Sequence, residues 1–389
     1  MKIIDIRART VPISRFADAS IPSGGLTTTM VAVVTDVVRS GQRIVGFGFS
    51  SIGRFGQQGL IEERFAPRLR QAAFADLSDE TGTNIDPFRA WRVMMTGEKP
   101  GGHGERCVAV GTLDMALWDL AAKIADVPLY RHIACHGPAA PAPSVKVYAG
   151  GGYYYPESDV GRLADEARRA RDLGYTRFKL KIGGAPLAQD LKRIEAVSTI
   201  MRDPAHVAVD AMNAYGRDAA LQAAASLTPC GLWWFEDICD PLDFATLAEV
   251  VGSYDGAVAA GEALFSVAEA KLLAAHGGLR KQRDILLFDP VHCYGLPGYL
   301  QIVREFDARG WDRDRFWPHG GHLFTLHLVQ GLGLGGAEVN PFCFQPFGGL
   351  ADGTLIAEGR TAAPDLPGIG FEGRTSTRQA FAELVGERS

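Results

Sequence analysis

The sequence predicts an α/β protein whose larger part is a (β/α)8-type barrel, preceded by a small α+β domain. Two observations lead to this expectation. From Val145 onward, eight short strand-like runs alternate with helical stretches. In addition, six ionisable residues recur once per strand and helix unit. Because the active sites of such barrels lie at the carboxyl ends of the strands, these six residues are the first candidates for a functional site.

Composition limits the kinds of partner this protein can have. A chain of 389 residues is long enough for two domains. The net charge of -5, without a basic run, argues against nucleic acid and against a polybasic membrane contact, which favours a small-molecule ligand. Six scattered cysteines without a CxxC pair are typical of reduced thiols in a cytoplasmic protein. The start MKIIDIRARTVPI alternates like a strand rather than a signal peptide, and no stretch has the ~18 apolar residues of a membrane span.

Residues 1–135 are predicted to form the α+β capping domain. The runs TTTMVAVVTDVV and QRIVGFGFSS favour an antiparallel hairpin, and residues 61–73 and 87–95 favour helices. A longer helix is indicated by apolar residues at helical spacing before Pro128, namely Val110, Leu113, Leu117, Leu120 and Ile124. Three prolines, Pro138, Pro141 and Pro143, then indicate a stiff linker.

Residues 144–350 are predicted to form the barrel. Its expected strands are VKVYAGG, RFKLKI, HVAVDA, LWWFED, AVAAGE, ILLFD, RFWPHG and AEVNPF. Strands of ~5–6 residues, helices of ~11–12 and two loops of ~2–6 give a repeat in the mid to high twenties. The six ionisable residues follow this repeat, with separations of 29, 26, 26, 27 and 30 residues. They are Lys181, Asp210, Glu236, Glu262, Asp289 and His319. Such spacing places them around one mouth of the barrel.

Three of these residues form a candidate metal site. Asp210, Glu236 and Glu262 lie on consecutive predicted strands, so their carboxylates should converge. Two unit charges at ~4 Å repel by roughly 4 kcal/mol at a surface-like dielectric, and a bound cation would relieve that repulsion. Hard oxygen ligands without cysteine favour Mg²⁺, with Mn²⁺ possible. The alternative is that the carboxylates form structural ion pairs with lysine or arginine.

The second predicted strand carries two lysines on one face. Lys179 and Lys181 point away from the apolar face of the run, so they either face solvent or enter the barrel mouth. The barrel repeat favours the mouth. We expect the like charge of Lys179, together with the metal, to lower the pKa of Lys181, which would then act as a base.

Asp289 and His319 form a second candidate catalytic pair on adjacent strands. The carboxylate would orient the imidazole and keep it basic. His322, three residues further on, is an alternative partner for Asp289, or it caps or lines the following helix. A metal between basic groups suits the abstraction of a proton next to a carboxylate, because Mg²⁺ stabilises the enediolate that results.

These residues and several sequence blocks resemble the enolase superfamily over nearly the whole chain. The resemblance rests on DMALWDLAAK, KLK, the carboxylate trio, the Asp289–His319 pair and PDLPGIGFEG near the end. Within that superfamily the chain is similar to the mandelate racemase subgroup. The blocks EKPGGHGER, GGYYYP, KIGGAP, PHGGH and GLGLGG are most similar to the D-tartrate dehydratase family.

The resemblance implies Mg²⁺-assisted dehydration of a hydroxy acid, a tartrate-like diacid or an acid sugar, to a 2-keto acid. Lys181 would take the α-proton and His319 would protonate the leaving β-hydroxyl. Residues 351–389 would return to the capping domain and complete it. We also expect a homo-oligomer. The alternatives are a racemase or epimerase of a 2-hydroxy acid, and a non-catalytic barrel that keeps its metal and only binds a ligand.

Further residues are candidates for substrate binding. Lys99 lies on a glycine-rich loop that could reach the mouth, and Tyr154 follows the first barrel strand. Glu338, at the end of the eighth predicted strand, either donates a hydrogen bond to a substrate carboxylate or pairs with Lys179. His322 and Asn213 are the remaining candidates for binding the substrate.

Two features depart from the family pattern. The usual Asp-x-Asn of the third strand is replaced by DAMN, which puts Met212 in the place of the second-position asparagine, with Asn213 after it. The early loop FADASIPSGGLTTT has no lysine, although the tartrate enzymes carry one there. Both changes bear on which substrate is used rather than on the reaction class.

Overall fold

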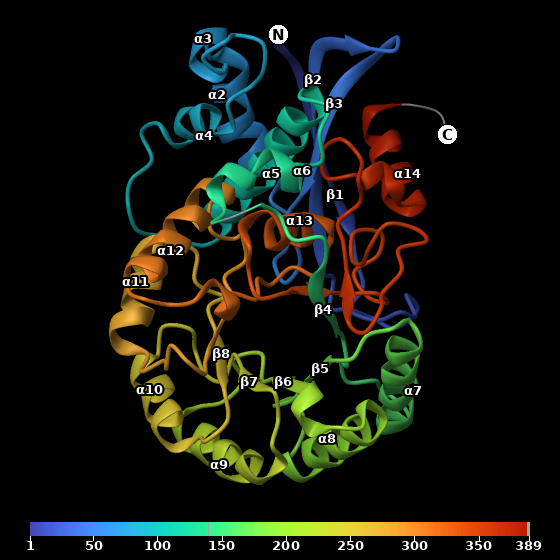
Figure 1. Ribbon diagram of the computed structural model, residues 1–389, viewed down its shortest axis with the longest axis vertical. Coiled ribbons are helices and arrows are strands. Elements are labelled where there is room, and N and C mark those ends of the chain that lie inside the picture. Colours follow the sequence, from blue (N-terminus) through green and yellow to red (C-terminus); the bar gives the residue numbers. More distant parts are fainter. Residues whose placement is uncertain (139, 387–389) are drawn as a thin grey trace.

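The computed structural model describes residues 1–138 and 140–386, which form an antiparallel sheet with its helices above a curled parallel sheet (Figure 1). The antiparallel sheet has the order β1-β2-β3. Its strands are β1 (Ile3–Pro12), β2 (Thr27–Arg39) and β3 (Gln42–Phe49). The predicted hairpin is confirmed as the β2 and β3 pair.

Short helices cover this part of the molecule. They are α1 (Gln58–Leu60), η1 (Ile61–Phe65), α2 (Ala66–Gln71), α3 (Phe74–Leu77), α4 (Pro87–Met95), α6 (Leu129–His132) and η2 (Ala134–His136). The predicted helix over residues 87–95 is confirmed as α4. The predicted helix over residues 61–73 consists of η1 followed by α2.

Helix α5 (Glu105–Ile124) joins the two sheets and is buried from Cys107 to Lys123. A helix that is buried on all sides must satisfy its polar side chains internally. Asp119 accepts hydrogen bonds from the backbone N–H groups of Phe47 in β3 (2.9 Å) and Ile369 near the C-terminus (2.7 Å). Asp114 accepts one from the N–H of Leu296 in the barrel (2.7 Å). One helix therefore fixes three distant segments relative to one another.

The parallel sheet has the order β10-β4-β5-β6-β7-β8-β9. Its strands are β4 (Val145–Gly150), β5 (Phe178–Lys181), β6 (Val207–Asp210), β7 (Trp234–Glu236), β8 (Val258–Ala260), β9 (Ile285–Leu286) and β10 (Ala337–Val339). These seven strands coincide with seven of the eight predicted runs. Parallel pairing requires long crossovers, and each of these carries helices.

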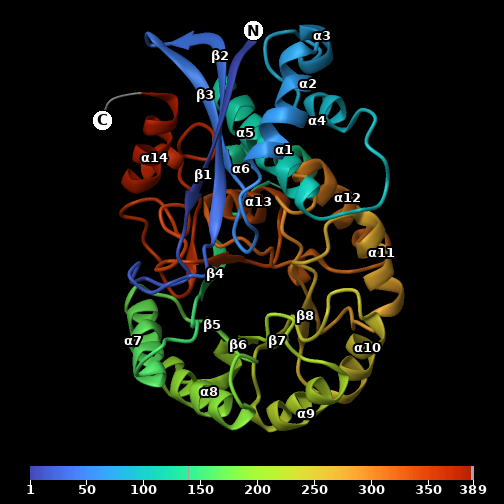
Figure 2. The same cartoon turned by 180° about the vertical axis from the view of Figure 1, so that it is seen from behind.

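The helices that follow the strands surround the sheet, with α13 lying between the barrel and the capping part (Figure 2). They are α7 (Asp159–Asp172), α8 (Leu187–Met201), α9 (Arg217–Leu227), α10 (Phe244–Ser253), α11 (Val267–His276), α12 (Leu296–Ala308) and α13 (Leu323–Leu332). Single turns η3 (Pro204–His206), η4 (Thr228–Cys230) and η5 (Arg313–Arg315) lie in the connections.

The seventh predicted strand, RFWPHG, is a correction to the sequence analysis. It forms only an isolated bridge between Phe316 and Leu286. The N–H of Trp317 donates to Leu286 (2.9 Å), and Phe316 accepts from Gly335 (3.0 Å), so the segment still links β9 to the neighbourhood of β10. The N–H of His319 still donates to Leu287 (3.1 Å), but the preceding Pro318 has no N–H and cannot donate on the side that faces away from β9, which limits the segment to an isolated bridge.

After β10 the described chain returns to the N-terminal sheet. Strand β11 (Arg360–Thr361) pairs antiparallel with the start of β4, and η6 (Phe371–Gly373) precedes α14 (Thr375–Val385). Helix α14 lies beside the antiparallel sheet (Figure 1), where Arg7 of β1 donates a hydrogen bond to the carbonyl of Val385 (2.6 Å). Helix α14 therefore contacts the antiparallel sheet, while the assignment of residues 351–389 to the capping domain stays a prediction. The boundaries at residues 135, 144 and 351 stay predictions, and the predicted linker contains residue 139, which lies outside the described residues.

Over residues 1–138 and 140–386, no helix is both long enough and apolar enough to cross a bilayer.

Gly111 tests the contact between α5 and the barrel. A Cβ at this position would lie 1.9 Å from the carbonyl oxygen of Val291, on the loop after β9. We expect Gly111→Ala to lower the free energy of unfolding by about 1–3 kcal/mol, because backbone atoms must move apart. Urea unfolding measures this change. In the matched control Gly161→Ala, within α7, the new methyl group meets nothing within 4 Å, and stability should rise slightly. Equal effects of the two substitutions would contradict the close approach.

His327 of α13 should make the fold sensitive to acid. Its Nδ1 accepts from the N–H of Tyr130 (3.1 Å) and its Nε2 donates to the carbonyl of Ile369 (2.9 Å), so the neutral ring is required. Burial lowers the pKa of His327 to about 3. Below the unfolded pKa of about 6.5, the unfolded chain therefore binds more protons, and stability falls as the pH decreases toward 3.

This histidine alone should cost about 2 kcal/mol between about pH 7 and pH 5. Urea unfolding across that range should show a shallower pH dependence for His327→Gln than for the unmodified protein. The exposed residue His276 supplies the control His276→Gln, which should leave the slope unchanged. An unchanged slope in His327→Gln would show that this ring does not titrate on unfolding.

Candidate active site

The register of the parallel strands places three predicted site residues side by side. Lys181 at the end of β5 is the register partner of Asp210 in β6, and Asp210 is the partner of Glu236 in β7. All three side chains are buried. Residues aligned across parallel strands project from the same face of the sheet, so these three groups form one row at the barrel mouth.

Both lysines of β5 point inward, because Lys179 and Lys181 are only 1% and 8% exposed. The ammonium of Lys179 lies 2.5 Å from Glu236, 3.2 Å from Glu338 and 3.6 Å from Asp210. Lys181 donates a hydrogen bond to Asp210. Each buried ammonium thus has a carboxylate partner, as burial of charge requires.

The carboxylates of Asp210, Glu236 and Glu262 converge as the sequence predicts. They offer ligand atoms that all lie within 4.8 Å of one another. Oε2 of Glu262 is buried without a hydrogen-bond partner among the described residues. Burial, opposed by Lys179 but reinforced by the neighbouring Asp210 and Glu262, raises the pKa of Glu236 to about 8. The buried Oε2 of Glu262 accepts no hydrogen bond from the described part of the chain, its cationic neighbour His319 is 3.6 Å away, and the Glu236 carboxyl group is hard to ionise, so the donor set lacks positive charge and fits a hard divalent cation.

Asp237, the residue after Glu236, is a buried acidic group that was not predicted from the sequence. Its carboxyl group is buried, and burial with the nearby charge of Glu262 raises its pKa well above the usual value. The acidic residue is visible in the sequence, since the strand reads FED. Adjacent residues in a strand point to opposite faces, so only one of the two acidic side chains was expected to face the barrel mouth.

The expected pKa of Lys181 requires a correction. Burial is the largest effect and lowers it, and Lys179 also lowers it, as predicted, but Asp210, Tyr153 and Glu262 together raise it by more, so the net pKa of Lys181 is raised. The like charge two residues away entered the prediction, whereas the carboxylate on the next strand did not. Cross-strand distance, rather than sequence distance, decides the sign.

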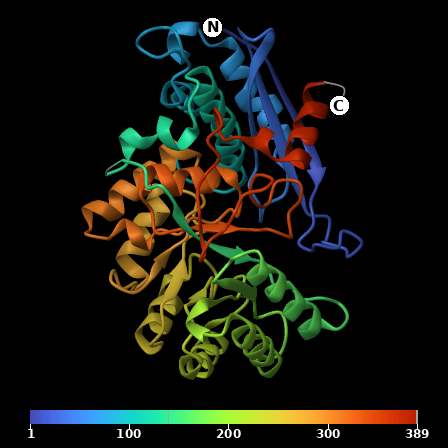
Figure 3. The same ribbon diagram turned by 45° about the vertical axis from the view of Figure 1, so that its right-hand side comes forward.

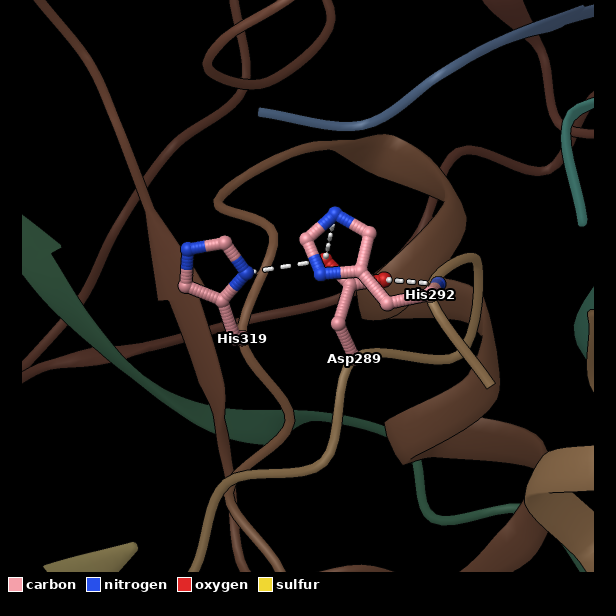
Figure 4. A group of neighbouring side chains, drawn as sticks. All are labelled: Asp289, His292 and His319. Atoms are coloured by element: carbon pink, nitrogen blue, oxygen red, sulfur yellow. Dashed lines mark hydrogen bonds and ion pairs between the residues drawn. The ribbon is translucent and has the colours of Figure 1, made fainter. Parts of the chain in front are cut away.

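Asp289 is hydrogen-bonded to His319, with 2.8 Å between Oδ2 and Nδ1 (Figure 4). Nε2 of His319 lies 3.6 Å from Oε2 of Glu262 and so faces the carboxylate trio. Burial opposes a charge on this ring, but Glu262 and the bond to Asp289 raise the pKa of His319 to about 9. The imidazole is therefore protonated near neutral pH.

His322, the alternative partner, reaches Asp289 only through a serine. Ser51, just after β3, donates to Oδ2 of Asp289 (2.7 Å), and its oxygen lies 3.1 Å from Nε2 of His322. Because the serine proton goes to the carboxylate, the ring must donate to the serine oxygen. Burial lowers the pKa of His322 to about 4, so this ring is neutral. The structure pairs Asp289 directly with His319. Ser51 was missed because it lies 238 residues from Asp289 in the chain.

His292 is a second histidine beside Asp289 that the sequence analysis did not select. Its Nε2 lies 3.7 Å from Oδ2 of Asp289, and its ring centroid lies 5.7 Å from that of His319 (Figure 4). The backbone N–H groups of Val291 (2.7 Å) and His292 (3.3 Å) donate to the other oxygen of Asp289. In the sequence, His292 is marked only by its position three residues after Asp289. Histidines on loops are often this close to an acidic residue without binding a ligand or taking part in catalysis.

The substrate-binding candidates occupy different environments. Glu338 pairs with Lys179 and accepts a hydrogen bond from the N–H of Gly320 (3.3 Å). Burial raises the pKa of Glu338, but the charges of Lys179 and His319 lower it by more. The net pKa is therefore lowered, and the carboxylate is ionised. The side chain of Lys99 is exposed, and no hydrogen bond or ion pair joins it to another described residue. Asn213 donates its side-chain amide to the carbonyl of Cys239 (2.8 Å). Met212 is 41% exposed, so it does not fill the interior of the barrel.

Tyr153, rather than Tyr154, lies beside the lysines. The hydroxyl of Tyr154 donates to Asp190 (2.5 Å), which directs it away from the cluster. The ring centroid of Tyr153 lies 5.1 Å from the ammonium of Lys181. Phe16, in the early loop, contacts this ring with 6.3 Å between centroids.

The early loop itself lies next to α7 (Figure 3), where Asp18 pairs with Arg162 (3.4 Å). Two residues before this loop, the carbonyl of Ser14 accepts from the N–H of Phe344, on the loop after β10 (2.7 Å). The lysine-free loop therefore contacts the wall of the barrel mouth.

A family model described as enolase C-terminal domain-like matches residues 162–376, more than half of the chain. The chain belongs to the enolase superfamily. One relative is the L-talarate/galactarate dehydratase of Salmonella typhimurium. It is 27% identical to this chain over 348 residues, which cover 88% of this chain and 81% of that protein.

Two solved structures of the superfamily share the fold. A racemase from Streptomyces coelicolor with bound magnesium gives a TM-score of 0.75 at 22% identity and covers 98% of both chains. An L-talarate dehydratase from Polaromonas, complexed with Mg and L-glucarate, gives 0.72 at 24% identity over 94% of this chain and 93% of that one. The predicted superfamily and fold class are confirmed, whereas the likeness to the D-tartrate dehydratase family stays a prediction.

The raised pKa of Glu236 has a measurable consequence for cation binding. At about pH 7 this carboxyl group holds a proton, which a cation in the trio must displace. We expect Mg²⁺ binding to release up to about one proton at pH 7 and fewer above pH 8. Calorimetry in two buffers of different ionisation enthalpy measures this number. Glu236→Gln should abolish the release, and buffer-independent heats for the unmodified protein would contradict the assignment.

Proposed function

We propose that the protein is a Mg²⁺-dependent dehydratase of an acid sugar or related hydroxy acid. It removes the α-proton, eliminates the β-hydroxyl and yields a 2-keto acid. One observation carries the proposal: proton-transfer groups stand at both ends of the carboxylate trio. Lys181 is hydrogen-bonded to Asp210 at one end, and His319 lies 3.6 Å from Glu262 at the other.

The metal assignment is supported by the donor set. Asp210, Glu236 and Glu262 would hold Mg²⁺, since they supply three hard oxygen ligands and one of these oxygens, Oε2 of Glu262, accepts no hydrogen bond from the described residues. When bound, Mg²⁺ supplies the positive charge that stabilises the enediolate of the substrate.

Lys181 is proposed as the base that takes the α-proton. It must lose its own proton first, and its partner Asp210 opposes this by holding the ammonium charged. When Asp210 is also a metal ligand, its negative charge stabilises the ammonium of Lys181 less. Binding of the cation therefore favours the neutral amine. Lys179 would be a positioning residue, because its ammonium neutralises Glu338, donates a hydrogen bond to Glu236 and keeps both side chains in place.

His319 is proposed as the acid that protonates the leaving hydroxyl. Asp289 fixes Nδ1, so the proton available for transfer is on Nε2, which faces the trio. The pKa of about 9 keeps this ring charged at neutral pH, as a proton donor requires. Ser51 and the two backbone N–H groups hold Asp289 in turn.

The substrate class rests on the relatives. A talarate/galactarate dehydratase matches most of the chain, which supports an acid sugar. A tartrate-like diacid, as the sequence blocks suggest, stays a narrower prediction. The proposed substrate-binding set is Lys99, Asn213, His322 and Glu338, with Tyr153 beside Lys181 in place of Tyr154, whose hydroxyl donates to Asp190.

A racemase or epimerase is the second candidate. Bases at both ends of the trio also permit one group to remove the α-proton and the other to return it. Such an enzyme would invert the substrate without forming a 2-keto acid. A barrel that only binds its ligand would do neither.

The test begins with a screen of acid sugars and tartrate isomers with Mg²⁺ for 2-keto acid. With a substrate in hand, Lys181→Ala should abolish both dehydration and exchange of the α-proton with D₂O. His319→Asn should lower dehydration by about 10²–10⁴-fold and still allow exchange, because only the acid is lost. Proton NMR of the substrate in D₂O follows both processes.

His276→Asn, on the exposed end of α11, is the matched control and should behave as the unmodified protein. Normal dehydration in His319→Asn together with its loss in His322→Asn would move the acid role to His322. Exchange in Lys181→Ala but not in His319→Asn would make the histidine the base. Inversion without keto acid in the unmodified protein would establish the racemase instead.

A further inference from the structure

Asp289, His292 and His319 form a second cluster of metal-ligating side chains (Figure 4). One nitrogen of each ring and one carboxylate oxygen all lie within 4.8 Å of one another. All three residues are buried. The cluster differs from the carboxylate trio in its chemistry, because two of its three donors are imidazole nitrogens.

Nε2 of His292 is the least satisfied atom of this cluster. The residue is 2% exposed, and Nε2 has no hydrogen-bond partner among the described residues. The other nitrogen, Nδ1, lies 3.4 Å from the backbone carbonyl of Glu262, which can only accept, so Nδ1 carries the proton. Nε2 then presents its lone pair toward Oδ2 of Asp289 at 3.7 Å. Two electron-rich atoms face each other with nothing between them, an arrangement that a cation would stabilise.

The outer contacts of both rings match those of metal ligands. A metal-binding histidine usually donates its other N–H to a backbone carbonyl or a carboxylate. His292 does so toward the carbonyl of Glu262, and Nε2 of His319 faces the carboxylate of the same residue at 3.6 Å. Both rings are therefore held with one nitrogen turned toward Asp289.

The distances agree with a tetrahedral ion. Ligands about 2.0–2.1 Å from Zn²⁺ at tetrahedral angles lie roughly 3.3 Å apart. Oδ2 of Asp289 is 2.8 Å from Nδ1 of His319 and 3.7 Å from Nε2 of His292, so both distances are within about half an ångström of that value, and the ring nitrogens of the cluster lie within 4.8 Å of each other.

We propose that Asp289, His292 and His319 bind Zn²⁺ or a similar transition-metal ion, separately from the Mg²⁺ site, and that its binding inhibits the enzyme. Nitrogen donors select zinc, whereas the all-oxygen trio selects Mg²⁺, so both ions can be bound at once. Water completes the coordination. The binding itself does not depend on the proposed function.

Inhibition, in contrast, rests on the proposed role of His319. An ion on Nδ1 replaces the hydrogen bond to Asp289 and prevents the ring from becoming imidazolium. A neutral, metal-bound imidazole is a much weaker acid, so it no longer protonates the leaving hydroxyl. Zinc should therefore block dehydration more than it blocks exchange of the α-proton.

The test titrates the Mg²⁺-saturated protein with Zn²⁺ by calorimetry and locates the ion by anomalous diffraction at the zinc edge. We expect one zinc ion between Asp289, His292 and His319. His292→Asn lacks Nε2 and should weaken zinc binding by at least about 10-fold, the effect that loss of an outer-shell partner already causes. His276→Asn should bind zinc as the unmodified protein does. Asp210→Asn, which alters only the trio, should keep the zinc site.

Zinc located only at the carboxylate trio, or bound equally by His292→Asn and the unmodified protein, would overturn the proposal. Diffraction from the unmodified protein keeps the test valid even when a variant fails to fold. Zinc bound at this cluster without inhibition would support the site and contradict the acid role of His319. Inhibition that His292→Asn escapes would support both.

Discussion

The register of the parallel strands is the constraint on which the site depends. Lys181, Asp210 and Glu236 are direct partners across β5, β6 and β7. Side chains alternate along a strand, so a slip of one residue would turn any of these groups toward the helices. There a buried charge would have no partner, at a cost of several kcal/mol. The same ion pairs that hold the site therefore also select the register, and the fold and the site specify each other.

The barrel and the carboxylate trio could be predicted because both are periodic. A strand, a helix and two loops repeat at a nearly constant length, and Asp210, Glu236 and Glu262 follow that repeat. The exception is the run RFWPHG, in which Pro318 removes a hydrogen-bond donor and leaves a bridge in place of a strand. The proline is visible in the sequence. The prediction of a strand nevertheless followed the spacing of the repeat rather than the effect of this proline.

What the sequence could not provide are relations between segments that share no period. Ser51 approaches Asp289 from the other sheet, and the choice between His319 and His322 depends on which ring the carboxylate reaches. The charge on Lys181 likewise depends on Asp210 across the strands more than on Lys179 along the strand. His292 and Tyr153 lie on connecting loops, where spacing carries little information about direction. Each of these relations depends on a distance between segments that are far apart in the sequence. Such distances are determined only once the core has packed.

Glu262 links the two proposed ion sites. Its carboxylate belongs to the trio and faces His319, and its backbone carbonyl faces His292. The loop after β8 thus contributes to both sites from one residue. Any change in its backbone would alter the environment of both histidines and of the trio together.

Ser51 makes the barrel dependent on a residue outside it. The serine follows β3, and its hydroxyl completes the hydrogen bonds of Asp289 together with groups from the loop after β9. In evolution, the two parts of the chain therefore cannot be recombined freely between relatives. A chimaera that joins this barrel to another N-terminal half would inherit a working dyad only when that half brings a hydroxyl to the same place, so residues 51 and 289 should be exchanged as a pair.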